Sequence, residues 1–215
     1  MSCIFCTLDK SKRENTILEE TRYFYVIPTT GSLVVGYVLI LCKRHLYSMT
    51  ELNNEEKEEY ENLLEKYRNI FKSIYKKYPV IFEHGSSNGN TESKANSIDH
   101  AHTHIVNYQY RNEGKMIKKL NFYPINDLTQ LTKHQNYILY INQNKEMYMT
   151  NHFPPISQLM RLEMAKELNI ENQYEWQKAR FDEKIEQTIS DINTYQEKQR
   201  IKSRNRLTRK HITEK

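Results

Sequence analysis

Three histidines alternate with small residues along one short stretch of the chain. The run reads His100-Ala-His102-Thr-His104 and continues into Ile-Val. In a β-strand every second side chain points to the same face, so the three imidazoles would form a row with a step of about 6.6 Å. Three of the eight histidines of the chain stand at this strict alternation. The pattern therefore indicates a functional cluster rather than a chance grouping.

Two kinds of chemistry suit such a row. An imidazole has a pKa of about 6.5, so a neutral ring nitrogen is available near pH 7 to attack phosphorus and form a covalent intermediate. Alternatively, a His-x-His pair can hold a metal whose bound water is the nucleophile. The spacing of the histidines leaves both chemistries open.

Cysteines form the second cluster of reactive residues. Cys3 and Cys6 make a C-x-x-C pair, and Cys42 stands alone in an apolar stretch. By itself the pair is compatible with redox chemistry or with no function, although a redox motif usually follows a strand. An odd number of cysteines fits a reducing compartment. No apolar run approaches about 18 residues and the first residues do not resemble a signal peptide, so we expect a cytoplasmic protein without a membrane segment.

Periodicity predicts the elements that position these residues. Aromatic and β-branched residues predict strands at 23–28, 36–42, 79–84 and 98–108. Between the second and third strands, apolar residues recur every three or four positions, which predicts one amphipathic helix from about Asn53 to Tyr78. Asn53 and Glu56 have the spacing of a capping box. This order predicts an α+β fold, an antiparallel sheet with one long packed helix.

The character of the chain changes after residue 110. Residues 137–141 and 147–149 predict a hairpin, and helices are expected from Ser157 to about 168 and from 173 to about 199. Residues 198–215 contain eight Lys or Arg and one Glu, so the remainder carries a net charge of −2 out of the total of +5. We therefore divide the chain into a domain at 1–110, a hairpin-and-helix extension at 111–197 and a basic tail at 198–215 that is expected to be disordered.

The histidine row and the residues before it resemble the histidine-triad (HIT) superfamily. His100-Ala-His102-Thr-His104-Ile-Val matches the HIT signature, and the segment Phe82-Glu-His-Gly85 followed by Asn96-Ser-Ile-Asp-His100 looks like the approach to the triad in a prokaryotic-type branch. Residues 156–161 and Trp176 look similar to the C-terminal part of longer members. The resemblance implies the HIT fold and a nucleotide phosphohydrolase that acts on phosphoramidates, dinucleoside polyphosphates or related nucleotide adducts.

The resemblance also implies a role for individual residues. His102 would be the nucleophile that becomes nucleotidylated, and His104 would bind the scissile phosphate or assist the leaving group. Ser97, Asn96 and Gly85 would bind substrate. Three histidines favour hydrolysis, although nucleotidyl transfer stays possible. His84 is either a support for the triad or a surface residue.

In relatives with an N-terminal C-x-x-C, zinc is held by residues that match Cys3, Cys6, His45 and His100. We therefore expect a structural Zn²⁺, no organic cofactor and a nucleotide substrate. Members of the superfamily often dimerise, so a homodimer is expected, and the extension would either cover the dimer edge or replace the partner. Only the basic tail suggests a nucleic-acid partner.

Some residues depart from the family pattern and keep alternatives open. Asn107 replaces a proline, Thr103 is polar, and Glu83 stands where several relatives have an amide that contacts phosphate. An anion at that position would repel the substrate. Two other functions remain, namely a zinc-dependent metallohydrolase with the histidine row as ligands and a non-catalytic nucleotide- or nucleic-acid-binding module.

Overall fold

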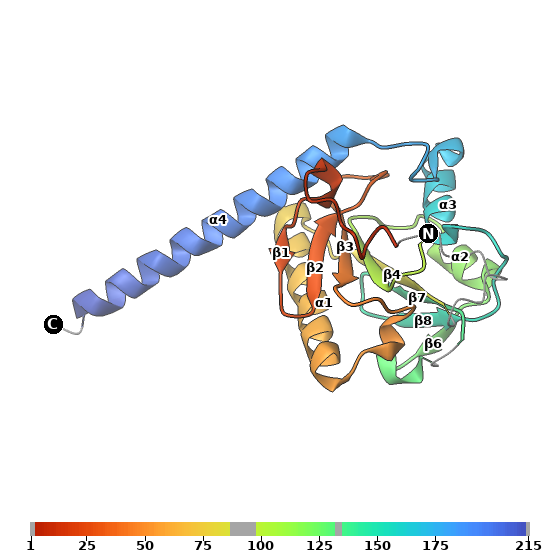
Figure 1. The fold of residues 1–215 in the computed structure, drawn as a ribbon, viewed down its shortest axis with the longest axis horizontal. Helices are drawn as coiled ribbons and strands as arrows, with labels where there is room; N and C mark the ends of the chain where they lie inside the picture. Colours follow the sequence, from red (N-terminus) through yellow and green to blue (C-terminus); the bar gives the residue numbers. More distant parts are fainter. Residues whose placement is uncertain (1–2, 87–97, 132–134, 214–215) are drawn as a thin grey trace.

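The computed structural model describes residues 3–86, 98–131 and 135–213, with side chains of the last helix described as far as residue 205. Its centre is a single antiparallel sheet in the order β1-β2-β3-β5-β4-β7-β8-β6 (Figure 1). The strands are β1 (Glu19–Glu20), β2 (Phe24–Pro28), β3 (Tyr37–Cys42), β4 (Val80–Gly85), β5 (His102–Val106), β6 (Tyr123–Ile125), β7 (Tyr137–Ile141) and β8 (Met147–Thr150). The α-helices are α1 (Asn54–Tyr75), α2 (Glu113–Lys119), α3 (Leu159–Glu167) and α4 (Asp182–Thr213). The predicted α+β fold is confirmed.

The histidine strand lies in the middle of the sheet. β5 pairs with β3 on one side and with β4 on the other, both antiparallel. In this register His104 stands opposite Leu39 and Phe82, and His102 stands opposite Leu41. A strand with two hydrogen-bonded neighbours is held rigidly, which suits side chains that must keep a fixed position.

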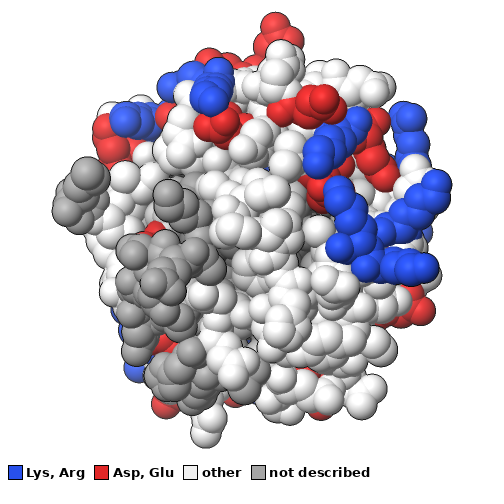
Figure 2. Space-filling view, turned by 90° about the vertical axis from the view of Figure 1, so that its right-hand side faces the viewer, with Lys and Arg blue, Asp and Glu red and all other residues white. Residues whose placement is uncertain are grey.

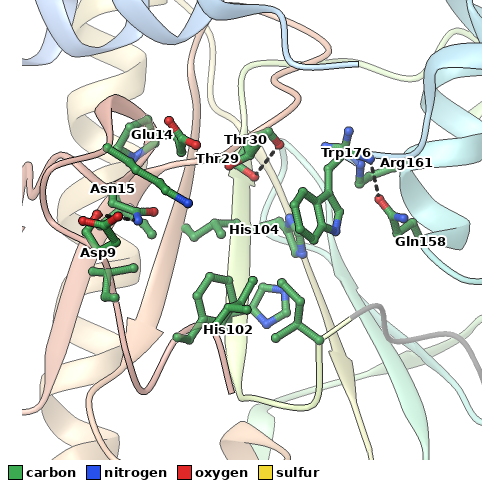
Figure 3. A pocket seen from close by; sticks show the side chains of 18 of the residues that line it. Asp9, Glu14, Asn15, Thr29, Thr30, His102, His104, Gln158, Arg161 and Trp176 are labelled. Carbon is green, nitrogen blue, oxygen red and sulfur yellow. Dashed lines mark hydrogen bonds between the residues drawn. The ribbon is translucent and has the colours of Figure 1, made fainter. Parts of the chain in front are cut away.

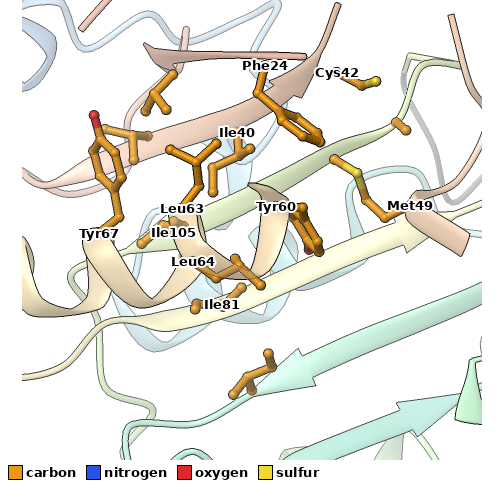
Figure 4. Packing of buried hydrophobic residues seen from close by; sticks show 14 of the residues in the cluster. Phe24, Ile40, Cys42, Met49, Tyr60, Leu63, Leu64, Tyr67, Ile81 and Ile105 are labelled. Carbon is orange, nitrogen blue, oxygen red and sulfur yellow. The ribbon is translucent and has the colours of Figure 1, made fainter. Parts of the chain in front are cut away.

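One face of the sheet is covered by α1. Its start is the predicted capping box, because Asn53 accepts from the Glu56 backbone N–H while the Glu56 carboxylate accepts from the Asn53 N–H. The apolar stripe of the helix packs over the sheet (Figure 4). This core contains Phe24, Ile40, Tyr60, Leu63, Leu64, Tyr67, Ile81 and Ile105, all buried. Burial of one such side chain contributes about 1.5–3 kcal/mol.

The opposite face is covered by the extension. Buried residues of α3, such as Met160 and Met164, pack with Tyr37, Leu39 and Phe82 of the sheet. The predicted hairpin is confirmed, because β7 and β8 pair antiparallel. β7 also pairs with β4 and so occupies the edge that β4 would otherwise present. The predicted boundary at residue 110 therefore falls within one continuous sheet.

Several predicted boundaries differ from the structure. β5 begins at His102 rather than 98, because residues 98–100 form a bend in which the His100 N–H donates to the Ile98 carbonyl. Ser157 does not cap α3. The N-cap residue of α3 is Gln158, whose backbone is in the left-handed conformation and whose side chain does not cap the helix. Its side chain is used elsewhere, since Gln158 Oε1 accepts from the Trp176 backbone N–H.

The second helix of the extension starts later and ends later than predicted. α4 begins at Asp182, after Phe181, which has a positive φ of 55°. Its first half is anchored by Ile185, Ile189 and Ile192 in the α1-side core. From there the helix continues to Thr213 and projects from the body (Figure 1). The tail expected to be disordered is therefore helical up to Thr213, which its Lys- and Arg-rich composition favours.

One face of the body has mixed charge (Figure 2). Figure 2 shows the end of the molecule around α2 and α3, where Lys and Arg gather at one side with Asp and Glu beside them and the centre is uncharged. This agrees with the net charge of −2 outside the tail. In the described residues no helix combines the length and the apolar character needed to cross a membrane.

Candidate active site

Two of the three alternating histidines share the face opposite α1. The rings of His102 and His104 lie with centroids 4.8 Å apart. His100 is different, because it precedes the strand and its ring turns toward the N-terminal cysteines. The expectation of a single row is therefore wrong for His100. The alternation rule holds only within the strand, and the bend at residues 98–100 interrupts it.

His102 has one ring nitrogen tied to the backbone. Its Nδ1 lies 2.6 Å from the carbonyl oxygen of His100, an acceptor, so Nδ1 carries the proton and donates. Nε2 then has the lone pair. The edge of Phe5 packs on the ring, with centroids 5.2 Å apart. Burial lowers the pKa of His102 to about 4, against the hydrogen bond to His100, which raises it. The ring is therefore neutral near pH 7.

His104 is held by two aromatic neighbours. Its Nδ1 lies 2.8 Å from the hydroxyl of Tyr37, and its ring stacks on Phe82 with centroids 4.4 Å apart. Both Tyr37 and Phe82 are fully buried. Burial holds the pKa of His104 well below its usual range, with smaller contributions from the nearby His102 and His84. This imidazole is also neutral.

His84 is a third buried imidazole at the site. Its side chain is 9% exposed, so it is not a surface residue, and its ring centroid lies 6.3 Å from that of His104. Burial lowers its pKa to about 3, and the neighbouring His102 adds to the shift. Its Nε2 has no hydrogen-bond partner among the described residues. A buried polar atom without a partner is unusual in a native structure and marks a place where a ligand can bind.

Cys3, Cys6, His45 and His100 come together beside the triad. Their ligand atoms all lie within 4.8 Å of one another. Cys3 Sγ is 3.3 Å from His100 Nδ1, and Cys6 Sγ is 3.3 Å from His45 Nδ1. His100 Nε2 lies 2.7 Å from the Cys42 carbonyl oxygen and donates to it, which leaves Nδ1 free as a ligand. Two thiols and two imidazoles at these distances fit a tetrahedral metal site.

A cavity of about 360 Å³ opens over His102 and His104. Its floor comes from the sheet, through Ile27, Leu39 and Phe82. Figure 3 shows Asp9, Glu14 and Asn15 of the N-terminal segment on one side and Gln158, Arg161 and Trp176 of the extension on the other. The two histidines lie between these walls. An apolar floor with a few polar groups is typical of small-molecule sites.

The extension supplies three lining residues that the sequence did not identify as site residues. Trp176, to which the family resemblance gave no role, lines the cavity. Gln158 and Arg161 are almost fully buried. The sequence held one indication of these residues, because residues 156–161 and Trp176 look similar to the C-terminal part of longer family members. That similarity pointed to the segment but gave its side chains no role.

Other predicted site residues have different outcomes. Ser97 and Asn96 lie outside the described residues. Gly85 is at the end of β4, where a Cβ atom would lie 2.2 Å from the Tyr137 ring, so close packing alone requires glycine. The concern about Glu83 is wrong, because its carboxylate faces α1, where it accepts from Met49 N–H and Tyr137 O–H. Side chains alternate along β4, and His84 rather than Glu83 faces the cavity.

A family model agrees with this site. The model described as "Scavenger mRNA decapping enzyme C-term binding", a histidine-triad-like domain, matches residues 2–120, more than half of the chain. The chain is a histidine-triad protein. The resemblance inferred from the triad residues is confirmed. The matched range of this histidine-triad protein includes β1 to β5 and α1, whereas β7, β8, α3 and α4 lie beyond it.

The similarity of this histidine-triad protein to solved structures is low in both sequence identity and TM-score. A hypothetical protein from Leishmania major is 22% identical, with 52% of this chain and 76% of that chain covered and a TM-score of 0.42. A HIT family protein from Bacillus anthracis is 20% identical, covering 53% and 77%, with a TM-score of 0.39. The diadenosine triphosphate hydrolase of Plasmodium falciparum is 20% identical, covering 50% and 71%, with a TM-score of 0.38. A comparison with curated proteins finds no match.

Proposed function

We propose that this histidine-triad protein hydrolyses a nucleoside phosphate bond through a nucleotidyl-histidine intermediate at His102. The observation that carries the proposal is the state of the His102 ring. Nδ1 donates to the His100 carbonyl, the pKa is lowered to about 4, and the ring borders a cavity of about 360 Å³. A neutral imidazole with a free Nε2 is a competent nucleophile toward phosphorus.

The reaction has two displacements. In the first, the Nε2 lone pair of His102 forms a bond to phosphorus while the bond to the leaving group breaks, and the leaving group takes a proton from solvent. The His102 ring becomes cationic, and its Nδ1–H donates to the His100 carbonyl, which stabilises that charge. In the second, water forms a P–O bond and gives one proton to solvent while the N–P bond breaks. The bonding electrons return to Nε2, so a nucleoside monophosphate leaves and neutral His102 is restored.

His104 is the phosphate-binding partner of His102. With Tyr37 donating to Nδ1, the neutral ring carries its proton on Nε2 and donates it to a phosphate oxygen. Ser97, Asn96 and the backbone at Gly85 are proposed as further substrate contacts. The candidate substrates are phosphoramidates, dinucleoside polyphosphates and nucleotidylated adducts, and the likeness to a diadenosine triphosphate hydrolase agrees with this class.

The cluster of Cys3, Cys6, His45 and His100 is proposed to hold a structural Zn²⁺. Bound there, Zn²⁺ would supply a tetrahedral cross-link between the N-terminus and the sheet. Phe5 lies between these cysteines and packs on both His100 and His102. The four residues therefore position one wall of the cavity. We expect one zinc per chain by elemental analysis, and loss of metal in a Cys3→Ser, Cys6→Ser double variant.

Cytoplasmic location and a homodimer remain predictions. The three cysteines are unpaired, as a reducing compartment would leave them. Since β7 already pairs with β4, a second copy cannot add to the sheet at β4, and a homodimer would use another surface. Light scattering of the purified chain would give the oligomeric state.

The experiment that tests the proposal is intact-protein mass spectrometry after a quenched reaction. The substrates are an adenosine phosphoramidate and diadenosine tetraphosphate. We expect an added AMP mass on the wild type and on the control His152→Ala, whose ring is at the surface. His102→Ala should show no adduct and a loss of turnover on the order of 10⁴-fold. Turnover that survives in His102→Ala would refute the proposal.

The same protein samples separate the two alternatives. A metallohydrolase would lose turnover with a chelator and form no adduct, so the fold is followed by circular dichroism alongside. A non-catalytic module with a working tail would be unaffected by His102→Ala and would lose binding when residues 198–215 are deleted. The proposed hydrolase should keep its turnover after that deletion.

A further inference from the structure

Arg161 is a buried cation that has no counter-charge among the described residues. It lies on α3, outside the range matched by the family model, and is 3% exposed. Its Nε donates to the Tyr174 carbonyl at 2.9 Å, and one terminal nitrogen donates to the Gly31 carbonyl at 2.7 Å. The other terminal nitrogen, Nη1, is buried and has no partner among the described residues. Within the described part of the chain, no ion pair joins Arg161 to a carboxylate.

A buried guanidinium without an anion is costly. The effective penalty of burying one ion is several kcal/mol, and carbonyl oxygens offset only part of it because they carry no net charge. One other buried charge is paired within the protein. Glu56, which is buried, accepts two hydrogen bonds from Arg44, at 2.6 and 2.7 Å. The missing anion alone does not identify a ligand, because the buried Arg68 of α1 also lacks a carboxylate partner among the described residues, so the position of the side chain must decide.

The position of Arg161 indicates where that ligand binds. The side chain lines the cavity above His102 and His104, on the wall that also holds Trp176 (Figure 3). Its charge also acts on His104, where it adds to the effect of burial in lowering the pKa of that ring. Glu14 lines the opposite wall, but its carboxylate is paired with Arg180.

The histidine rings and Arg161 can bind a phosphate in different ways. His102 Nδ1 is already bonded to the His100 carbonyl and His104 Nδ1 to the Tyr37 hydroxyl, so each of these rings has only Nε2 to offer. Neutral imidazoles bind phosphate oxygens by single hydrogen bonds, which are weaker than those of an ion. A guanidinium keeps its charge at every physiological pH and matches the geometry of phosphate oxygens. Among the described residues that line the cavity, Arg161 and Lys12 are the cations, and Arg161 is the buried one.

We propose that Arg161 binds the phosphate group of the nucleotide, so that the C-terminal extension completes the substrate site within one chain. This rests on the proposed function, since it deepens the same site. The ligand class is a phosphate monoester or anhydride carried by a nucleoside. Gln158 is a positioning residue for this wall, because its Oε1 accepts from the backbone N–H of Trp176, which keeps the Trp176 segment beside α3.

The chain contains a matched control for Arg161. Arg68, on α1, is 4% exposed and also donates to two backbone carbonyls, those of Asn142 and Gln143. Its Nε has no partner among the described residues. Arg68 differs from Arg161 in its position, since Arg161 lines the cavity of the triad and Arg68 does not. An arginine of this type that serves packing alone should behave as Arg68 does.

The experiment is calorimetric binding of AMP and of adenosine to the full chain with its metal bound. The proposal predicts that Arg161→Gln weakens AMP binding about 30- to 100-fold and changes adenosine binding less than about threefold. Arg161→Lys should reduce the preference for AMP over adenosine about three- to tenfold, because the charge stays and the second donor is lost. Arg68→Gln should leave this preference unchanged. Circular dichroism confirms that each variant is folded.

Each contrary outcome is informative. If Arg161→Gln weakens AMP and adenosine equally, Arg161 only shapes the cavity and the proposal is wrong. If Arg161→Gln does not fold, Arg161→Lys decides, and an unchanged preference for AMP overturns the proposal. A wild type with no preference for AMP over adenosine also overturns it. These binding results do not depend on turnover. If the wild type prefers AMP over adenosine but forms no adduct at His102, the proposed function is refuted and the proposal for Arg161 is not.

Discussion

Glu83 and His84 are neighbours in β4, but they belong to two different regions of the molecule. Both are buried and both can carry charge, and the alternation of the strand points them to opposite faces of the sheet. On the α1 face, both carboxylate oxygens of Glu83 have partners, Met49 N–H at 2.8 Å and Tyr137 O–H at 2.6 Å. On the cavity face, His84 Nε2 has no partner among the described residues.

The difference separates a structural network from a binding site. The α1 face continues from Glu83 through the Tyr137 hydroxyl to Ser48, and on the next strand Thr103 bonds to Tyr60. These groups satisfy one another, so they stabilise the fold and have nothing left to offer a ligand. Among the described residues, the cavity face leaves hydrogen-bonding atoms open at His84 and Arg161, which line the cavity. The open atoms of α1, the Tyr67 hydroxyl and Arg68 Nε, belong to residues that do not line it. Unsatisfied buried groups reduce stability, and they are tolerated where a ligand completes them.

The largest expected effect comes from testing the two faces of the sheet with one substitution on each. Glu83→Ala leaves the Met49 N–H and the Tyr137 hydroxyl unpaired, so it should lower the free energy of unfolding by about 3 kcal/mol. Its kcat per folded molecule should stay within about twofold of the wild type. His84→Phe should do the reverse, with stability unchanged or slightly raised and KM raised about tenfold. Urea unfolding and steady-state kinetics give both numbers, and a loss of kcat in folded Glu83→Ala would contradict the division.

The pH dependence of stability sharpens the same comparison. Burial raises the pKa of Glu83 to about 7, against the hydrogen bonds from Tyr137 and Met49. The carboxyl of the unfolded chain ionises near pH 4.5. Between pH 4.5 and 7 the folded state therefore holds a proton on Glu83 that the unfolded state has lost. The stabilisation from this proton is lost as pH rises from 4.5 to 7. For His84, with a folded pKa of about 3 and an unfolded value of 6.5, stability is lost as pH falls from 6.5 to 3.

Between pH 4.5 and 6.5 the two contributions oppose each other, each with a limiting slope of about 1.4 kcal/mol per pH unit. Single substitutions should therefore change the slope in opposite directions. Glu83→Gln should make stability fall more steeply as pH is lowered through this window, and His84→Phe should make it fall less steeply or rise. Urea midpoints measured at half-unit steps test this. Slopes that shift in the same direction would contradict the assignment of the two groups.

The sequence predicted the main elements around this site, β5 and α1, correctly apart from their exact ends. Strict alternation and the capping box at Asn53 depend on neighbours in the chain, so β5 and α1 could be read from local pattern. The grouping of Cys3, Cys6, His45 and His100 was also predicted, although only through the family resemblance, and the structure brings these four residues together. The pattern could not show which side of β4 faces His102, and Glu83 was therefore placed on the wrong face.

Long-range contacts explain the rest of what was missed. Arg161 is separated from Gly31 by 130 positions, and the contact exists only because α3 folds over the cavity face. Nothing in its local sequence distinguishes it from a solvated arginine on an amphipathic helix. Tyr37 likewise looks like an ordinary strand aromatic until its hydroxyl meets His104. Residues whose role depends on a partner far along the chain have no signature in a single sequence.

The smallest expected effect concerns Tyr37, which connects the core of the cavity face to the triad. In the proposed mechanism the Tyr37 hydroxyl donates to His104 Nδ1 and keeps the ring proton on Nε2. Tyr37→Phe removes that donor, so a fraction of His104 should present Nε2 without its proton. We expect kcat to fall about tenfold and KM to stay within about twofold, because the shape of the cavity is kept. Tyr110→Phe is the matched control, since its buried hydroxyl donates to the Met160 carbonyl on the same face and Tyr110 does not line the cavity. Both variants should lose about 1 kcal/mol of stability, so an equal fall of kcat in both would show that a general loosening of this face, rather than the tautomer of His104, limits the reaction.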